Sequence, residues 1–371
     1  MKKLVFLILS LVILLSCGKK LEQKDVFSMS WDEIKANAKG QEVSITMWGG
    51  SKEINLYFDN FIAPNLKEKY GVNLRRVPVT DIREATNKML VEAKAKGKAG
   101  SVDVIWLNGE NFHFVKNNDL LLGDINSILP NINNVDKIAL ASDFGEPVEG
   151  LEAPLGQANF IMISNIKNPP TNTKALKEWL KNNKGRFTYP NSNDFVGNAF
   201  IRTIAVDILG RTDFQVEDMK PVWDYFNEIK PYLWREGKTY PESSERLSDL
   251  FSSGEVDFTM SYAPSIVENK VATGEFPKGT SAFVFDVGSF TNNHYLTIAK
   301  NTKNPEASLV FINYMLSEEA QSEKLKSSVW GDGSVLRSLQ KVYFEPQLEE
   351  LGPKITEDIK DEWNKNVAQK N

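Results

Sequence analysis

The chain has 371 residues, with 44 lysines and arginines against 49 aspartates and glutamates, so its formal net charge is −5. This acidic balance offers no basic face to a phosphate backbone, so we expect no nucleic-acid partner. The length is typical of two domains. There is only one cysteine, so no internal disulfide holds the fold together.

The first 17 residues have the pattern of a bacterial lipoprotein signal. Two lysines precede an apolar run, 4–15, which is shorter than the ~20 residues that span a bilayer. Ser16 then precedes Cys17, which looks like a lipobox. We therefore expect residues 1–16 to be a signal peptide and the new amino-terminal Cys17 to carry lipid. An ordinary cleaved signal with a chance cysteine is the alternative.

Export to a membrane surface is the consequence. Cleavage leaves 42 basic and 49 acidic residues, a charge of −7, and no later apolar run reaches membrane length. We expect an exported lipoprotein on the outer face of the cytoplasmic membrane or in the periplasm, with residues 17–40 as the lipidated tether. In this tether Ser30, followed three residues later by Glu33, predicts a short capped helix.

From Val43 the sequence alternates strands with helices. Strands are predicted at 43–47, 72–79 and 102–107. The intervening helices begin at Ser51 and Asp81, which are good N-cap residues. Pro64 should kink or split the first of them, because its ring clashes with the preceding turn. This β-α-β-α-β order predicts a parallel sheet covered by helices on both faces.

A second α/β set follows a predicted loop at 152–156. Strands are predicted at 159–164, 186–189, 256–262, 280–285 and 295–299, and helices at 173–179, 195–209, 216–229, 244–253 and from 304. The order favours two α/β lobes joined by extended segments; a single-domain α/β enzyme is the alternative. Our predicted boundaries are 41–155 and 286–329 for a discontinuous lobe 1, 156–285 for lobe 2, and 330–371 for a C-terminal helical segment.

The usual catalytic signatures are missing. His113 and His294 have no neighbouring acidic or cysteine ligand, and neither H-E-x-x-H nor G-x-S-x-G occurs. Gly237-Lys238-Thr239 imitates the end of a phosphate loop, but Tyr232 stands where its first glycine belongs. We expect no catalytic residue, no metal and no cofactor. Paired carboxylates of a glycosidase remain compatible with the sequence, so a surface lipoprotein enzyme acting on carbohydrate is one alternative, and a lipoprotein adhesin or scaffold is another.

Candidate ligand residues follow the predicted strands of the first lobe. Ligands of open α/β sheets bind beyond the carboxyl ends of the strands. The first strand ends in Trp48-Gly49-Gly50, where glycines permit close approach of the backbone to a ligand. The third strand leads through Asn108-Gly109 to Glu110 and Asn111 at the start of a helix. A tight turn and ordinary helix capping are the structural alternatives.

Several blocks resemble one protein family. They are Trp48-Gly49-Gly50, residues 104–112 (VIWLNGENF), residues 143–150 (DFGEPVEG), residues 186–190 (RFTYP), residues 317–321 (SEEAQ) and residues 330–333 (WGDG). Together they resemble the YnjB-like branch of the extracellular solute-binding proteins. The resemblance implies a type 2 periplasmic-binding fold, with two lobes around a cleft, and delivery of a solute to the permease of an ABC importer. The branch is usually described as thiamine-related. Leu155 stands where the relatives are expected to have a bulkier aromatic residue. This departure concerns the identity of the ligand rather than the fold.

The resemblance adds candidates from the second lobe and the crossings. They are Tyr189, Asp194, Phe195, Ser261 and Tyr262 in lobe 2, Gln157 and Asn159 on the first crossing, and Asp286 on the second. Aromatic faces with carboxylates suit a small cation such as thiamine, a ring over a cation contributing ~0.5–2 kcal/mol. Packing between the lobes or in the core is the alternative for Tyr189, Phe195 and Tyr262. We expect a monomer whose partners are a small-molecule solute, a cognate ABC permease and the membrane.

Replacing Cys17 with serine should abolish lipid attachment, because the chain has no other thiol. The Cys17→Ser protein should remain an uncleaved precursor or appear in the aqueous fraction after detergent phase separation. Normal processing and membrane retention of this variant would contradict the lipobox interpretation.

Overall fold

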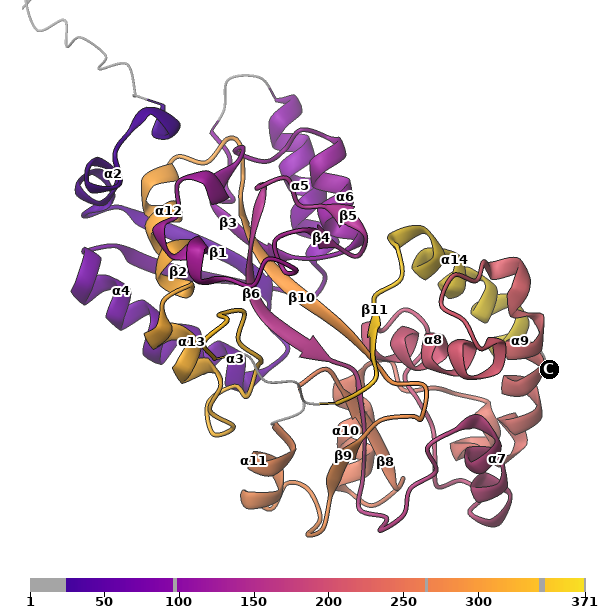
Figure 1. Cartoon of the computed structure of the whole chain (residues 1–371). Helices are drawn as coiled ribbons and strands as arrows, with labels where there is room; N and C mark the ends of the chain where they lie inside the picture. Colours follow the sequence, from indigo (N-terminus) through magenta and orange to yellow (C-terminus); the bar gives the residue numbers. More distant parts are fainter. Residues whose placement is uncertain (1–24, 96–98, 264–265, 340–343, 370–371) are drawn as a thin grey trace, which may run out of the picture.

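The computed structural model describes residues 25–95, 99–263, 266–339 and 344–369. Figure 1 shows a lobe 1 made mostly of the indigo and purple part of the chain and a lobe 2 made mostly of the pink and salmon part. The predicted signal peptide (1–16) and Cys17 lie outside the described residues, so the structure does not bear on them.

Lobe 1 is built on a six-stranded sheet. Its strands are β1 (Glu42–Trp48), β2 (Asn73–Val79), β3 (Val104–Leu107), β6 (Glu152–Asn159), β10 (Ser289–Ile298) and β11 (Gln347–Glu349). Strands β1, β2 and β3 are parallel, as predicted. Strand β10 runs antiparallel to both β3 and β6, so the sheet is mixed rather than wholly parallel. The reason is that the chain enters β10 from lobe 2 and not through a helical crossover.

Helices cover both faces of this sheet (Figure 1). They are α2 (Trp31–Ala38), α3 (Lys52–Leu56), α4 (Ala63–Tyr70), α5 (Ile82–Lys94), α6 (Glu110–Asn117), α12 (Pro305–Met315) and α13 (Glu318–Lys324). Helices α5 and α6 pack on the face that carries Ile105 and Leu107, and α12 packs on the opposite face. The predicted capping box of α2 is present, because Ser30 and Glu33 exchange side-chain to backbone hydrogen bonds of 3.3 and 2.7 Å.

The predicted kink at Pro64 takes the form of a π-helical turn. Helix α3 continues through this turn (η2, Tyr57–Ile62) directly into α4. Pro64 lies in the first turn of α4 and has no N–H to donate. The wider π turn before it accommodates the ring without ending the helix.

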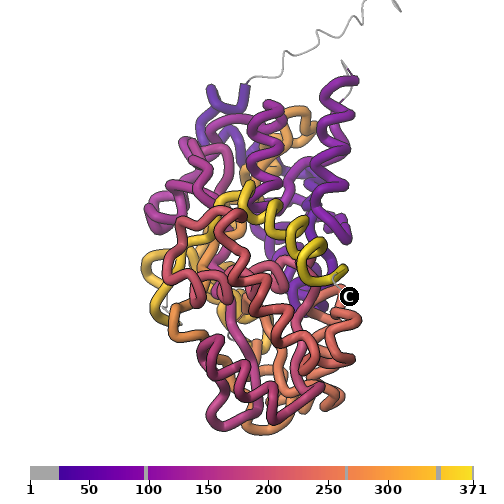
Figure 2. Tube along the Cα trace, turned by 90° about the vertical axis from the view of Figure 1, so that its right-hand side faces the viewer, coloured from indigo at the N-terminus to yellow at the C-terminus, as the bar shows by residue number. Residues whose placement is uncertain are grey.

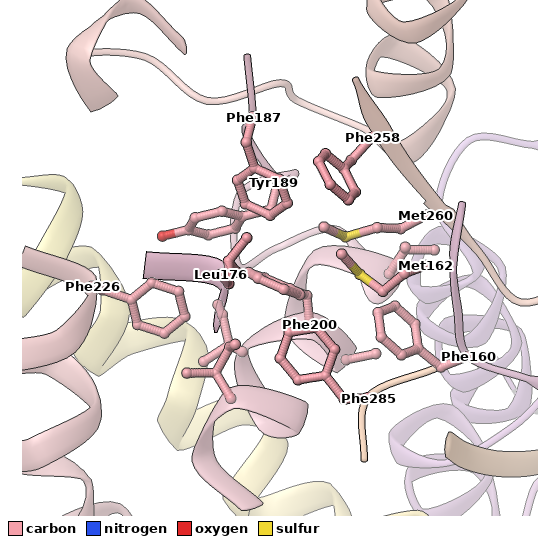
Figure 3. Close-up of a cluster of buried hydrophobic side chains, with 14 of the residues drawn as sticks. Phe160, Met162, Leu176, Phe187, Tyr189, Phe200, Phe226, Phe258, Met260 and Phe285 are labelled. Atoms are coloured by element: carbon pink, nitrogen blue, oxygen red, sulfur yellow. The ribbon is translucent and has the colours of Figure 1, made fainter. Parts of the chain in front are cut away.

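Lobe 2 surrounds a three-stranded sheet in the order β8-β7-β9. The strands are β7 (Ile161–Ser164), β8 (Phe258–Ser261) and β9 (Ser281–Phe283), with β7 antiparallel to both neighbours. The helices are α7 (Thr173–Asn182), α8 (Phe195–Leu209), α9 (Lys220–Ile229), α10 (Ser244–Ser252), α11 (Ile266–Ala272) and α14 (Pro353–Trp363). Figure 3 shows the aromatic core that they enclose.

The predicted loop at 152–156 is wrong, because these residues begin the long strand β6. Pro154 and Gly156 suggest a loop when the segment is considered alone. In the fold β6 pairs along its whole length with β10, and the register shifts between His294 and Tyr295, opposite these two residues. A bulge of this kind accommodates a proline within a strand, so long-range pairing overrides the local signal.

The predicted strand at 186–189 is also not formed. The segment is irregular, although two of its carbonyls are used: Arg186 O accepts from the Asp257 N–H and Phe187 O accepts from the Trp234 N–H, each at 2.8 Å. These bonds go to a loop and to a short 3₁₀ helix rather than to one neighbouring strand. The strand-favouring residues of this segment are therefore buried without joining a sheet.

The C-terminal part differs from the single helical segment expected for residues 330–371. Trp330 is buried in the lobe 1 core, β11 pairs with β10, and α14 buries Ile359 and Trp363 in the lobe 2 core. One apolar core takes in residues 160–290 and 351–367, whereas the others take in residues 26–155 and 296–336. The chain thus passes between the lobes three times rather than twice.

A buried ionic cluster lies where β6 and β10 meet. Lys324 forms an ion pair with Asp332, whose carboxylate also lies 2.9 Å from His294 Nε2. The Trp330 ring stacks on His294 with centroids 5.7 Å apart. Burial by itself would raise the pKa of Asp332, but its interactions with His294 and Lys324 outweigh this effect, and the pKa falls below its usual value. Gly156 makes room for this cluster, because a Cβ there would lie 1.8 Å from Asp332 Oδ2.

Replacing Gly156 with alanine should force this buried ion pair apart. Separating buried charges costs about 3–5 kcal/mol, which corresponds to a fall of roughly 10 °C in the thermal midpoint. Differential scanning calorimetry of Gly156→Ala tests this. Gly352→Ala is the matched control, because the nearest atom to a Cβ there is 4.0 Å away. Equal midpoints for the two variants would show that the cluster tolerates displacement.

Candidate functional site

The lobe 1 side of the junction between the lobes is the turn that follows β3. Gly109 has φ 55° and ψ −121°, and its N–H donates to Asp143 Oδ2 at 2.6 Å. Phe144 packs against the same glycine, because a Cβ there would lie 3.3 Å from its ring. The hairpin of β4 (Ser142–Asp143) and β5 (Glu146–Pro147) is thereby fixed to the start of α6.

An aromatic series crosses from this hairpin into lobe 2. The ring centroids of Phe144 and Phe195 are 6.1 Å apart, those of Phe195 and Tyr262 are 4.8 Å apart, and those of Tyr262 and Phe160 are 5.7 Å apart. Phe195 is 40% exposed although it is a large apolar side chain. The predicted candidates Phe195 and Tyr262 therefore lie together at the junction, with one accessible aromatic face.

A buried polar cluster lies behind Tyr262. Its hydroxyl donates to Glu350 Oε1 at 2.7 Å, and Asn292 Nδ2 donates to the same oxygen at 2.9 Å. Arg202 forms an ion pair with the other oxygen of Glu350 and lies over the Phe290 ring, 4.7 Å from its centroid. Burial, reinforced by the charge of Glu350, raises the pKa of Tyr262 well above its usual value. Tyr262 is therefore a neutral hydrogen-bond donor.

Sequence reasoning missed most of this cluster. Arg202 stands within an apolar helix, and a charged residue in such a position requires a buried partner, so a signal was available. Glu350 and Asn292 carry no such signal, because only the third crossing and the long β10 strand bring them to Arg202. Phe144 belongs to a family block but was not singled out as a site residue.

The glycines after β1 have a packing role. A Cβ on Gly50 would lie 2.1 Å from the Trp48 ring, and one on Gly49 would lie 2.6 Å from Pro78 Cβ. The Trp48 ring thus covers the backbone of Gly50. This backbone does not form an open cradle for a ligand.

Glu110 and Asn111 lie together on lobe 1. They line a pocket of about 270 Å³ with Arg83, Thr86, Asn87 and Phe114. Glu110 Oε1 accepts from Arg83 at 2.7 Å and from Lys360 of α14 at 3.3 Å. The charge of Glu110 raises the pKa of Arg83. The carboxylate of Glu110 is therefore already paired with two cations, one from each lobe.

The candidates on β6 and β8 are used mainly by the fold. Asn159 Nδ2 donates to Thr291 Oγ1 at 2.6 Å, and the Asn159 N–H donates to Tyr262 O at 3.3 Å. The backbone of Gln157 pairs with Gly333. Ser261 Oγ accepts from the Ala263 N–H at 3.0 Å. These residues hold the crossing and the strand end that carries Tyr262.

Tyr189 does not lie at the junction. It is fully buried in the lobe 2 core, and Figure 3 shows its ring between Phe187 and Phe226. Its hydroxyl accepts from Trp363 Nε1 at 3.2 Å. The alternative of core packing, which the sequence left open, therefore describes Tyr189.

The two lobe 2 aspartates also make structural contacts. Asp194 is the N-cap of α8, accepting from the Gly197 N–H at 2.8 Å, and it also accepts from the Ser244 N–H at 3.1 Å. Burial raises the pKa of Asp194. Asp286 is exposed and accepts from Asn172 Nδ2 at 2.9 Å, in the loop before α7.

Two buried carboxyl groups lie behind the hairpin. Glu152 is 0% exposed and its two carboxyl oxygens have no hydrogen-bond partner among the described residues. Burial raises its pKa well above the usual value, and the charge of Asp143 adds to the effect. Burial likewise raises the pKa of Asp143, against the opposing hydrogen bond from Gly109. These groups therefore favour the neutral form in the folded protein.

A family model for bacterial extracellular solute-binding proteins matches residues 62–353. The chain is also 35% identical over 339 residues to Protein YnjB of Escherichia coli (strain K12), covering 86% of this chain and 87% of that protein. The chain belongs to the bacterial extracellular solute-binding proteins. The resemblance to the YnjB-like branch is thereby confirmed.

Solved structures confirm the predicted fold of this solute-binding protein. An ABC transporter protein from Clostridium perfringens ATCC 13124 is 17% identical with a TM-score of 0.64, covering 88% of this chain and 98% of that chain. A periplasmic thiamin binding protein is 15% identical with a TM-score of 0.64, covering 89% of this chain and 96% of that chain. The spermidine/putrescine substrate-binding protein PotD from Streptococcus pneumoniae is 15% identical with a TM-score of 0.62, covering 89% of this chain and 98% of that chain. At these identities the likeness shows the two-lobe, type 2 fold alone.

Leu155, the departure from the expected family pattern, lies in the lobe 1 core of the solute-binding protein. It is fully buried, and its carbonyl accepts from Gln321 Nε2 at 2.9 Å. Within the described ranges, no group of three or more acidic, histidine or cysteine side chains is placed to hold a metal ion. No helix in the part of the chain that the structure describes is both long and apolar enough to cross a membrane.

Glu152→Gln should stabilise the protein at neutral pH but not at acid pH. Because the folded pKa of Glu152 is raised, its contribution to stability is present below the unfolded value of 4.5 and is lost as the pH rises toward the folded value. Removing the titration should increase the free energy of unfolding at pH 8 by about 1.4 kcal/mol for each unit of the shift. The thermal midpoints of both proteins between pH 4 and pH 8 measure this.

Glu146→Gln is the control of opposite sign. Hydrogen bonds from Lys116 and His113 lower the pKa of Glu146, so its contribution is present above the unfolded pKa and lost as the pH falls. This variant should be less stable than the parent at pH 7 and equal to it at low pH. Parallel pH profiles for the two variants would contradict the assignment of Glu152 as a neutral buried acid.

Proposed function

We propose that this protein is the substrate-binding component of an ABC importer and captures a small organic cation of the thiamine type by closure of its two lobes. It acts as an exported monomer, held to the membrane by lipid on Cys17, and delivers its solute to a cognate permease. The observation that carries the proposal is Phe195, an accessible aromatic ring between the lobes beside Tyr262.

The charges at the junction support a cation rather than an anion. Among the residues that the structure describes there, Arg202, Arg83 and Lys360 are each paired with a glutamate. An anionic solute would have to displace one of these carboxylates. The accessible aromatic face of Phe195 suits an organic cation.

Two rival functions receive less support. An anion site on Gly49-Gly50 conflicts with the Trp48 ring, which covers that backbone. A carbohydrate-cleaving enzyme would need two carboxylates that reach the substrate, whereas Asp143 and Glu152 are buried. Binding without catalysis is the simpler function for this junction.

The relatives add support of a general kind. Two of the structurally similar proteins are described as binding organic cations, thiamin in one case and spermidine or putrescine in the other, and two are described as ABC transporter proteins. The family blocks imply a cleft between two lobes, and Phe195 and Tyr262 lie together at the junction between the lobes of this chain.

Thermal-shift titration tests the proposed ligand class. Thiamine should raise the midpoint, since a ligand specific for the folded form stabilises it by ~2.7 kcal/mol at a hundredfold excess over Kd. Phe195→Ala should weaken binding by about 2- to 30-fold, the loss of one ring over a cation. Val91→Ala is the matched control, because Val91 is an exposed apolar residue on α5.

Inorganic phosphate and maltose complete the comparison. Stabilisation by phosphate or maltose, with no response to thiamine or spermidine, would contradict the cation assignment. A response to thiamine that Phe195→Ala leaves unchanged would place the ligand elsewhere than at the aromatic series.

A further inference from the structure

Four charged side chains of alternating sign join the two lobes. Arg83 on α5 and Glu110 on α6 belong to lobe 1, and Glu357 and Lys360 on α14 belong to lobe 2. Arg83 lies 2.7 Å from Glu110 and 3.7 Å from Glu357, and Lys360 lies 3.3 Å from Glu110 and 3.0 Å from Glu357. Figure 2 shows α14, in yellow, lying across the middle of the molecule between the lobes.

We propose that these four residues form an ionic latch that holds the lobes together, so that Glu110 and Lys360 set the balance between open and closed forms. This proposal rests on the proposed function in one respect, which is that closure of the lobes retains the solute. Two of the contacts, Glu110 with Lys360 and Arg83 with Glu357, cross between the lobes. Both break when α14 moves away from α5 and α6.

Rigid elements carry the two halves of the latch. Asp143 fixes the Gly109 turn from which Glu110 begins α6. On the other side, Ile359 and Trp363 flank Lys360 on α14 and are buried in the lobe 2 core. The two halves of the latch can therefore separate only when one lobe moves as a whole relative to the other. Separation of the charges therefore reports lobe opening rather than a local rearrangement.

The exposure of the latch fits a reversible contact. The side chains of Arg83 and Glu357 are 49% and 48% exposed, so water and salt screen their attraction. Lys360 is less exposed, at 16%, and lies between two carboxylates. A contact of this kind biases closure without preventing opening.

The latch also changes the expected role of Glu110. Both of its oxygens lie within 3.4 Å of Lys360 Nζ, so the carboxylate is already occupied in this structure. If Glu110 bound the solute directly, only variants of Glu110 would affect retention. If it is half of a latch, Lys360 variants have the same effect.

Fluorescence energy transfer between the lobes tests this in the absence of any solute. The Cys17→Ser full chain has no other thiol, so Val91→Cys in lobe 1 and Lys220→Cys in lobe 2 place one label on each lobe at exposed positions. Glu110→Gln, Lys360→Gln and their combination are compared at 50 and 500 mM NaCl. Lys354→Gln is the control, because Lys354 on the same helix pairs with Asp358 of α14.

Each single variant should lower the ratio of closed to open form by about 2- to 5-fold at low salt, and the double variant should add little to either one. High salt should open the parent and the Lys354→Gln control and should change the two latch variants less, because only the Arg83–Glu357 contact between the lobes remains in them to be screened. Additive effects, or a parent insensitive to salt and to both substitutions, would overturn the latch. Since no solute is present, these outcomes are separate from the thermal-shift result on the ligand class.

Discussion

The buried ion pair of Lys324 and Asp332 is the interaction on which the crossing between the lobes depends. It lies where β6 and β10 meet, and His294 brings β10 directly into contact with it. Breaking a buried pair costs about 3–5 kcal/mol, because the remaining charge has no solvent. The two long crossing strands are therefore fixed on the lobe 1 side, and the glycine at 156 is the residue that permits this closeness.

A second buried ion pair lies on the other side of the crossing. Arg202 belongs to lobe 2, Glu350 directly follows β11, and Asn292 of β10 donates to the carboxylate of Glu350. Asn292 and His294 are two residues apart on β10, so they point to the same face of the strand. One strand thus contacts an ion pair in each lobe. If the lobes change their orientation, we therefore expect the backbone to bend in the short segments between these two ion pairs.

The sequence predicts the parts of this arrangement that depend on local pattern. Strands β1 to β3, the cap of α2 and the two-lobe fold follow from apolar spacing and family blocks. Residues 152–156 form a strand because of partners more than a hundred residues away. The burial of Tyr189 depends on a partner about fifty residues away. No local pattern near Glu350 indicates that it neutralises Arg202. The candidate site was therefore predicted in part, with Phe195 and Tyr262 at the junction and the polar residues behind them missing.

The difference in strength between the two kinds of charge contact bears on how such a protein can open. Breaking one of the buried ion pairs costs several kcal/mol. Partly exposed ion pairs such as Arg83 with Glu357 contribute about 0–1 kcal/mol to stability. Thermal energy can thus separate the exposed contacts while the buried ion pairs remain intact. Because the aromatic contact between Phe144 and Phe195 lies among the weaker contacts, opening exposes it before any strand pairing is lost. A solute that replaces Phe144 on the ring of Phe195 would therefore shift the equilibrium between open and closed lobes. The buried ion pairs do not oppose this shift, because they stay intact in both forms.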